Sequence, residues 1–336
     1  MSYATEKEKI EAKIKIWKRV LLGIVVFVLL FLCAFSAFVP PSTWKYRVSL
    51  PRIAKRANGE MRIHFLDVGQ GDATLIELPD GKCMLIDGGN GTEKTAIRLL
   101  RYLNALKIKK VDYLLSTHAD SDHCGGLDKV VEQKKIGLAY LPKVSKTAND
   151  EYADFYAALL ERECEMVYSS RSVSIDSKNS DYPFTLSFLY PYTHDVESVE
   201  EWREDANAYS AVVWLDYQGV SALFTGDAPT STEDILMRDD EMGLFKNRGV
   251  ELTSTEILKV AHHGSADSTS LGFLQYIHAE TAVISCGVNN LYGHPSKEVC
   301  QRLGEAGVTT YRTDQDDNVM ITVSKSGEYT VKKISF

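Results

Sequence analysis

The sequence HADSDH at residues 118–123 is the densest group of metal-ligand side chains in the chain. It follows the apolar run VDYLLST, which predicts a buried strand, and it precedes Gly125 and Gly126, which permit a tight turn. Imidazoles and carboxylates on a loop after a strand can surround one point and bind Zn²⁺, while extra carboxylates favour Mn²⁺. A polar turn that caps a helix would explain Asp122 but not two histidines. We therefore expect four metal-binding residues here: His118, Asp120, Asp122 and His123.

Two later segments have the form of further ligands. Asp227 ends the apolar run VSALFTGD, and a carboxylate at a strand end can bridge two cations. His262 and His263 follow the run EILKVA and precede another glycine. Taken singly, a terminal aspartate is usually a cap and a lone histidine a surface group. Counting His294, however, five of the eight histidines lie at or near the ends of predicted strands, which favours one shared site.

The chain from residue 61 onward alternates strand-like and helix-like segments. Three consecutive strands separated by turns are predicted by MRIHFLDV, ATLIELP and CMLIDGG. The next segment, TEKTAIRLLRYLNALKI, has the apolar spacing of a helix. A second half of the chain repeats this rhythm of strands and helices. Strand clusters flanked by helices in two comparable halves predict a layered α/β sandwich.

Composition and charge exclude several classes of protein. The 336 residues are 44% hydrophobic and 25% charged, which is typical of a folded globular protein and not of a disordered or fibrous one. Six cysteines without a CxxC pair indicate neither a zinc ribbon nor a dense disulfide framework. Residues 1–60 hold 11 Lys and Arg against 4 Glu, which leaves 27 basic and 42 acidic side chains for the rest. So acidic a body does not attract polyanions by bulk charge, and a nucleic-acid substrate would need a basic patch or bound cations.

The amino-terminal region contains an uncharged and almost wholly apolar run at residues 20–38. At about 1.5 Å per residue, a helix of this length matches a hydrocarbon core of roughly 30 Å, so we predict one transmembrane helix. The run has no polar stripe, which argues against a buried core helix. A signal peptide cleaved after Ser36 is the competing interpretation, although the run exceeds the usual apolar length of a signal. The predicted organisation is a basic cytoplasmic leader at 1–19, a transmembrane anchor at 20–39, a linker at 40–60 and a catalytic domain at 61–336.

Basic residues flank the predicted span on both sides in nearly equal numbers. Lys18 and Arg19 directly precede it, and the short leader is typical of a signal-anchor. We therefore expect a single-pass protein of the bacterial cell membrane with its catalytic domain outside the cytoplasm. The basic linker could contact anionic headgroups. The membrane is thus a predicted partner, and no protein partner is predicted.

Six motifs in the chain occur together in a recognisable order. They are FLDVGQGD at 65–72, the HxDxDH motif at 118–123, TGD at 225–227, HHG at 262–264, YGHP at 292–295 and YRTD at 311–314. In this combination the chain resembles the metallo-β-lactamase-fold domain of ComEC-type competence proteins over essentially residues 61–336. The resemblance implies an αββα sandwich with a dinuclear metal site at the edge between its two sheets.

The same resemblance implies a ligand for each position. His118 and Asp120 would bind the first metal, while Asp122 and His123 would bind the second. Asp227 would bridge the two metals. One of His262 and His263 would complete the second site, and spacing does not decide which.

Two departures from the broader superfamily bear on the metal. Asp120 stands where that superfamily usually has a histidine, and the chain lacks an obvious histidine between the HxDxDH motif and the TGD motif. Asn207 sits near the equivalent point, and His194 is a weak substitute. The expected cofactors are therefore two divalent metal ions, either Zn²⁺ or Mn²⁺.

A site with two such ions predicts hydrolysis, because paired cations activate water and stabilise the charge on an attacked phosphorus or carbonyl. Asp122 or Asp227 could accept the proton of the water. His294 and Lys259 are candidates to neutralise a substrate phosphate. The alternative for His294 is a turn residue before a proline, and the alternative for Lys259 is a structural role. Three residues of the first turn are expected to orient the ligands: Asp67, Gln70 and Asp72.

Three functions remain open at this point. The resemblance implies a surface-tethered phosphodiesterase or nuclease that acts on DNA, because the family's domain is held to degrade the strand that is not imported. With one predicted span, the chain cannot form a DNA channel alone. The alternative is a small-substrate hydrolase on the same scaffold, such as a phosphorylcholine or other phosphodiester esterase, or a lactonase. The third is a non-catalytic surface binding module.

Overall fold

The computed structural model describes residues 2–177, 181–192 and 206–336, and it divides into two units, residues 1–48 and 49–336. The first unit holds α1 (Ser2–Phe38), η1 (Pro41–Thr43) and α2 (Trp44–Val48). Within α1, Glu6–Phe38 is long and apolar enough to cross a membrane, a property that a signal sequence shares. The helix ends just before two prolines, as their fixed backbone geometry requires. The division between the units falls inside the predicted linker at 40–60.

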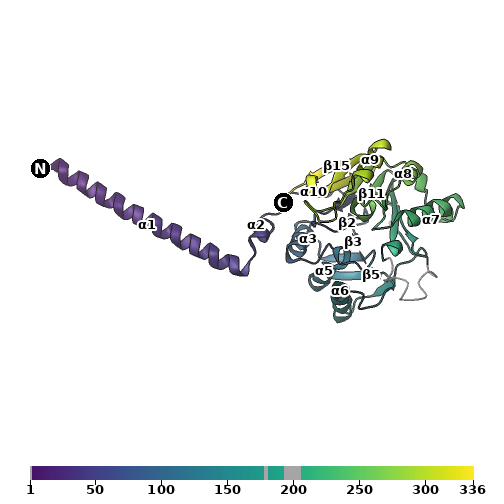
Figure 1. Ribbon diagram of the computed structural model, residues 1–336, viewed down its shortest axis with the longest axis horizontal. Coiled ribbons are helices and arrows are strands. Elements are labelled where there is room, and N and C mark those ends of the chain that lie inside the picture. Colours follow the sequence, from purple (N-terminus) through teal and green to yellow (C-terminus); the bar gives the residue numbers. More distant parts are fainter. Residues whose placement is uncertain (1, 178–180, 193–205) are drawn as a thin grey trace. The chain divides into compact units, whose positions relative to one another are not determined.

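The compact second unit is built on two sheets (Figure 1). In the described residues, the first sheet has the strand order β15-β14-β1-β2-β3-β4-β5-β6 and the second has the order β13-β12-β11-β10-β9-β8-β7. The strands of the first sheet are β1 (Met61–Phe65), β2 (Thr74–Glu77), β3 (Cys83–Ile86), β4 (Lys110–Leu115), β5 (Lys135–Leu141), β6 (Met166–Tyr168), β14 (Asn318–Val323) and β15 (Tyr329–Ile334). Those of the second are β7 (Ser174–Asp176), β8 (Phe184–Tyr190), β9 (Val212–Tyr217), β10 (Val220–Phe224), β11 (Ile257–Lys259), β12 (Thr281–Ile284) and β13 (Thr309–Arg312).

Helices cover the outer faces of both sheets. Those that pack on the first sheet are α3 (Glu93–Ala105), α5 (Leu127–Gln133) and α6 (Asp150–Glu161), and those on the second are α7 (Thr230–Glu241), α8 (Leu271–Ile277) and α9 (Lys297–Glu305). Short helical turns are α4 (Ser121–Cys124), α10 (Thr313–Asp316), η3 (Asn207–Tyr209), η4 (Lys246–Arg248), η5 (Leu252–Ser254) and η6 (Ala261–Gly264). One apolar cluster lies between the sheets and one lies under each helical layer. This layering confirms the predicted αββα sandwich.

Parallel pairing brings the predicted site residues to one edge of the sandwich. In the first sheet β3 pairs in parallel with β4, and in the second β10, β11 and β12 pair in parallel. The carboxyl ends of parallel strands meet at one edge of a sheet, which is where open α/β folds place their sites. The HADSDH loop follows β4, Asp227 follows β10, and the two adjacent histidines follow β11. The topology therefore gathers segments that are distant in sequence.

Candidate metal centre

The loop between β4 and α4 is shaped by contacts to its backbone. The carboxylate of Asp87, just after β3, accepts hydrogen bonds from the backbone N–H and the hydroxyl of Thr117, both at 2.8 Å. Gly71 has a φ of +133°, and a Cβ there would lie 2.3 Å from the carbonyl oxygen of Asp122. Asp72 donates its backbone N–H to that same oxygen at 3.0 Å. The ligand-bearing loop thus packs directly on the turn after β1, and only glycine fits the closest point.

The turn after β11 holds two adjacent histidines in an unusual backbone conformation. His262 and His263 have φ values of 49° and 52°, in the left-handed region that costs a non-glycine residue roughly 1–2 kcal/mol. Hydrogen bonds hold the turn, since His262 N–H donates to the Gly226 carbonyl at 3.1 Å and Ser265 N–H donates to the His262 carbonyl at 2.8 Å. As a result, both neighbouring imidazoles approach Asp227.

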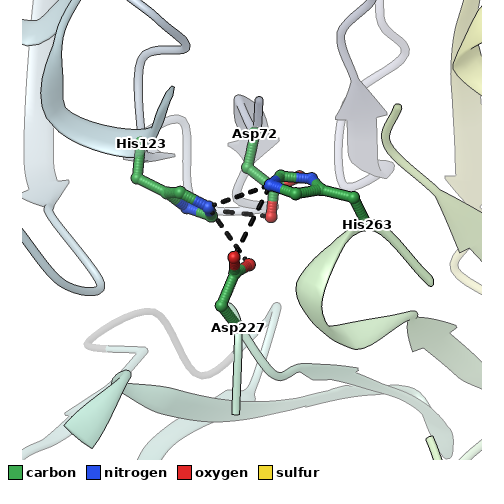
Figure 2. Close-up of side chains that lie close together, drawn as sticks. All are labelled: Asp72, His123, Asp227 and His263. Atoms are coloured by element: carbon green, nitrogen blue, oxygen red, sulfur yellow. Dashed lines mark hydrogen bonds and ion pairs between the residues drawn. The ribbon is translucent and has the colours of Figure 1, made fainter. Parts of the chain in front are cut away.

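Four side chains, which we call the buried cluster, meet at this edge: Asp122, His123, Asp227 and His263. The Nε2 atom of His123 lies 3.1 Å from Oδ1 of Asp227 and 3.3 Å from Nε2 of His263. The latter nitrogen is 3.2 Å from Oδ2 of Asp122 and 3.5 Å from Oδ2 of Asp227. Ligands around a tetrahedral ion with bonds of about 2.0–2.1 Å are separated by about 3.3–3.5 Å. Figure 2, which draws three of the four together with Asp72, shows these side chains pointing toward one another.

Three further predicted ligands, His118, Asp120 and His262, form what we call the open cluster. The His118 ring is buried, and its centroid lies 4.1 Å from that of the His123 ring. Its Nε2 has no hydrogen-bond partner among the residues described. That nitrogen is 3.7 Å from Oδ2 of Asp120, and Nε2 of His262 is 3.8 Å from Oδ2 of Asp227. A buried polar atom without a partner costs about 1–3 kcal/mol, which a bound cation would recover. The side chains of Asp120 and His262 are 46% and 22% exposed, so this cluster faces solvent.

The second nitrogen of each buried-cluster imidazole is fixed by a neighbouring acceptor. Nδ1 of His123 lies 2.9 Å from Oδ2 of Asp87. Nδ1 of His263 lies 2.9 Å from the carbonyl oxygen of Ser285. Such acceptors set the tautomer and orientation of a ligating histidine. Both rings therefore present Nε2 to Asp227.

Asp72 is also near the buried cluster, since Asp72, His123, Asp227 and His263 each offer an atom within 4.8 Å of the others. Its contacts, however, are with the Nδ1 edges of the rings, at 3.3 Å for His263 and 3.9 Å for His123. Its Oδ2 also lies 2.5 Å from Nζ of Lys259, which is buried. The geometry therefore favours Asp122 over Asp72 as a ligand. Asp72 contacts the Nδ1 edges of the rings and can orient them, as expected of this residue of the first turn. Lys259 pairs with Asp72, which fits a structural role, the alternative to binding a substrate phosphate.

The charges of the two clusters depend on one another. Burial would raise the pKa of Asp227, but the imidazoles of His123 and His263 hold it well below its ordinary value. Burial would lower the pKa of His263, yet the carboxylates of Asp227 and Asp72 raise it to about 10. Burial, with the charge of His123, lowers the pKa of His118 to about 4. The ionised carboxylates require positive charge, which imidazole protons supply and which a divalent cation would supply equally.

His294, a predicted catalytic residue, borders the open cluster. Its ring centroid is 5.6 Å from that of His262 and 6.3 Å from that of His263. Its Nδ1 is buried and has no hydrogen-bond partner within the described part of the chain. Burial and the charges of His263 and His262 lower its pKa.

Two residues of the first turn, Asp67 and Gln70, were also expected to orient the ligands. Asp67 pairs with Arg98 and accepts a hydrogen bond from the Gly69 N–H at 3.1 Å. Gln70 accepts one from the Gly287 N–H at 3.1 Å. These contacts hold the turn and a neighbouring loop, and the described contacts of Asp67 and Gln70 include no predicted ligand, so their expected role stays a prediction.

A protein-family model describes this combination of fold and site. The model of the metallo-beta-lactamase superfamily matches residues 66–288, which include both clusters. The chain belongs to the metallo-β-lactamase superfamily. It therefore has the fold of metal-dependent hydrolases, together with an Asp/His cluster able to hold metal.

Sequence relatives confirm the resemblance to ComEC-type competence proteins. ComE operon protein 3 of Bacillus subtilis (strain 168) is 28% identical over 282 residues, which are 78% of this chain and 33% of the relative. Competence protein ComA of Neisseria gonorrhoeae is 27% identical over 272 residues, 80% of this chain and 33% of the relative. The chain thus spans about a third of the length of these curated relatives. A solved structure, Zn²⁺-bound PqqB from Methylobacterium extorquens, matches with a TM-score of 0.42 and 8% identity over 75% of this chain and 87% of that one.

Asp87 is a site residue that the sequence analysis missed. It stands in an Asp-Gly-Gly sequence directly after β3, and a carboxylate at a strand end is the signal that identified Asp227. Asn207, the residue near the superfamily's missing histidine, has its Nδ2 3.4 Å from Nε2 of His262. His194, the other substitute considered, lies outside the described residues.

Proposed function

We propose that the protein is a membrane-anchored phosphodiesterase that cleaves DNA with two divalent cations, either Zn²⁺ or Mn²⁺. The position of Asp227 carries this proposal. Its Oδ1 faces His123 of the buried cluster at 3.1 Å, while its Oδ2 lies between the two clusters, 3.5 Å from His263 and 3.8 Å from His262. A carboxylate shared by two ligand sets is typical of sites that use paired cations for phosphoryl displacement.

The ligand sets follow from the contacts. The buried cluster would hold one cation through Asp122, His123 and His263, and His118 with Asp120 would hold the other, with Asp227 shared. We choose His263 over His262 because its Nε2 contacts two carboxylates of the buried cluster and its Nδ1 already has an acceptor. His262 would lie beside the cation held by His118 and Asp120.

The side chains of the pocket would manage the proton and the phosphate. Bound divalent cations supply an activated water and stabilise the negative charge that develops during hydrolysis. Burial would raise the pKa of Asp122, but its hydrogen bond to His263 helps to lower it to about 2. Asp122 and Asp227 are therefore ionised, as binding a cation or accepting a proton requires, although so low a pKa makes each a weak base. His294, at the border of the open cluster, can donate a hydrogen bond to a phosphate oxygen.

The similarity to competence proteins supports DNA as the substrate. The matched relatives include a competence protein by name, and the six ordered motifs resemble those of ComEC-type proteins. The acidic charge of residues 61–336 opposes binding of a polyanion, so a nucleic acid would depend on the two bound cations for local positive charge.

The proposed anchor is α1. Trp17 lies at one end of its apolar run, and Trp44 follows the other end with Lys45 and Arg47. Aromatic and basic residues at both ends are typical of a span that crosses both membrane interfaces. With Lys18 at its amino-terminal end, we expect the amino terminus in the cytoplasm and the catalytic unit outside it.

The test is an assay of the full chain in detergent micelles, reconstituted with Mn²⁺ or Zn²⁺, on single-stranded DNA, double-stranded DNA and bis-(p-nitrophenyl) phosphate. Asp227→Asn should lose at least about 10²-fold in activity on DNA, because the shared ligand is lost. A matched control is Asp128→Asn, whose carboxylate pairs with Lys129 on α5. Hydrolysis of the small ester with intact DNA would instead favour the small-substrate hydrolase. No hydrolysis and less than one bound cation would favour a binding module.

A further inference from the structure

We propose that residues 287–294, the loop that follows β12, form a stacking platform for an unpaired nucleobase beside the metal centre. This inference rests on the proposed phosphodiesterase function and narrows its substrate to single-stranded nucleic acid.

The loop exposes three large apolar side chains within five residues. Val288 and Tyr292 are 68% and 71% exposed, and Leu291 is fully exposed. In the rest of the described compact unit, exposed large apolar side chains occur singly or two at a time along the chain. A concentration of apolar surface beside a polar pocket indicates a binding site.

A series of rings connects the exposed loop to the open cluster. The Tyr292 ring stacks on the His294 ring, with centroids 5.7 Å apart and an interplanar angle of 24°. The His294 ring is in turn 5.6 Å from the ring of His262. A flat group on the free face of Tyr292 would extend this series of rings, and the strand attached to it could lead back past His294 toward the open cluster.

Hydrogen bonds hold the loop in this shape. The Asn290 side chain donates to the carbonyl oxygens of Gly287 and His294, at 3.0 and 2.5 Å, and accepts from the His294 N–H at 3.0 Å. The Gly287 N–H donates to the side chain of Gln70 at 3.1 Å. A loop braced in this way loses little conformational entropy when a ligand binds.

The acidic charge of the molecule leaves stacking as the main way in which this loop could hold a nucleic acid. Because the body is acidic, attraction of the phosphate backbone contributes little apart from the cations. Stacking on an aromatic ring supplies affinity that does not depend on charge and that any base can provide. Bases within a duplex are already stacked on both faces, so the platform selects an unpaired strand.

The experiment uses the full chain in detergent micelles with Mn²⁺ and compares two fluorescein-labelled oligomers. One is an oligothymidylate, and the other has the same backbone with abasic residues in place of the thymidines. Tyr292→Ala should raise the KM for the oligothymidylate about 5- to 100-fold with little change in kcat. Tyr292→Phe should keep the wild-type KM, and so should Tyr168→Ala, which removes an exposed tyrosine of β6. The wild-type KM for the abasic oligomer should match that of Tyr292→Ala.

Equal KM values for the wild type and Tyr292→Ala, or for the two oligomers with the wild type, would overturn the platform while the hydrolase function stands. A loss seen only in phosphatidylglycerol vesicles and not in micelles would also overturn it, because the loop would then contact lipid. If neither oligomer is hydrolysed, the proposed function fails, and fluorescence anisotropy with Ca²⁺ decides the platform separately. Binding that needs both the bases and Tyr292 supports it, and binding independent of either refutes it.

Discussion

The buried and open clusters share Asp227, yet the protein surrounds them differently. In the buried cluster, each imidazole is shielded from solvent and has a fixed acceptor behind it, Asp87 for His123 and the Ser285 carbonyl for His263. In the open cluster, two of the three side chains are partly exposed, and the carboxylate 3.2 Å from Nδ1 of His262, that of Asp267, is itself 60% exposed. Asp122 is the one partly exposed member of the buried cluster, at 28%. Shielded, braced ligands hold an ion tightly, whereas partly exposed ones leave room for exchange and substrate. We therefore expect a tightly held cation in the buried cluster and a weaker, substrate-facing one in the open cluster.

The largest effect is expected from His123→Ala. This substitution removes a buried ligand that also contacts the shared Asp227, so activity on DNA should fall at least about 10²-fold. Hydrolysis rates of the metal-reconstituted variant and wild type measure this. Equal rates would show that the buried cluster is not the seat of the chemistry.

The two adjacent histidines provide a matched pair. His263→Ala should lower both bound metal and activity about 10²-fold, because His263 contacts two carboxylates of the buried cluster. His262→Ala should cost about 10-fold or less, since His262 borders the exposed side. Metal content and rates are measured on both variants. The opposite ranking would assign His262, and not His263, to the ligand set of the buried cluster.

Asp87→Asn tests whether the brace matters without removing a ligand. The neutral amide is a weaker partner for Nδ1 of His123, and loss of such a partner typically lowers metal affinity about 10- to 100-fold. Competition with a chromophoric chelator measures the affinity, and the melting temperature of the metal-free protein reports any separate structural effect. An unchanged affinity would show that the carboxylate behind His123 does not contribute to metal binding.

Of these substitutions, Asn207→His should have the smallest effect, which should be a gain in the preference for Zn²⁺. It adds an imidazole beside His262, at the point where the broader superfamily has a histidine, and imidazole suits Zn²⁺. We expect the preference for Zn²⁺ over Mn²⁺ in the weaker site to rise by less than about 10-fold. Metal titrations of the variant and wild type would detect this change in preference. A changed preference in the tight site of the buried cluster would contradict the difference we expect between the clusters.

The sequence predicted the clusters because their residues lie at the ends of predicted strands, and parallel pairing brings such ends together. It could not separate His262 from His263, since their choice depends on two consecutive left-handed residues and on the pocket each ring then enters. It also could not show that Asp72 contacts the Nδ1 edges of His123 and His263. These features arise from tertiary packing, not from local pattern.

The fold was predicted least well between residues 135 and 176. There β6 and β7 are three-residue strands that form by pairing with β5 and β8, and such short segments have no periodicity of their own. The helix α6 was missed although a local signal exists, because Asn149 caps it by accepting from the Tyr152 N–H at 2.8 Å. The same asparagine donates to the Ala119 carbonyl at 2.6 Å, which ties the helix to the ligand loop.

The central claim, that separate loops converge on a pocket for paired cations, is tested most directly by counting bound metal. After dialysis of the full chain against Mn²⁺ and removal of free ion, elemental analysis should find about two equivalents in the wild type, given a two-cation site. Asp227→Asn should retain about one equivalent or less, because both ligand sets share this carboxylate. Less than one equivalent in the wild type, or equal content in the two proteins, would contradict the account.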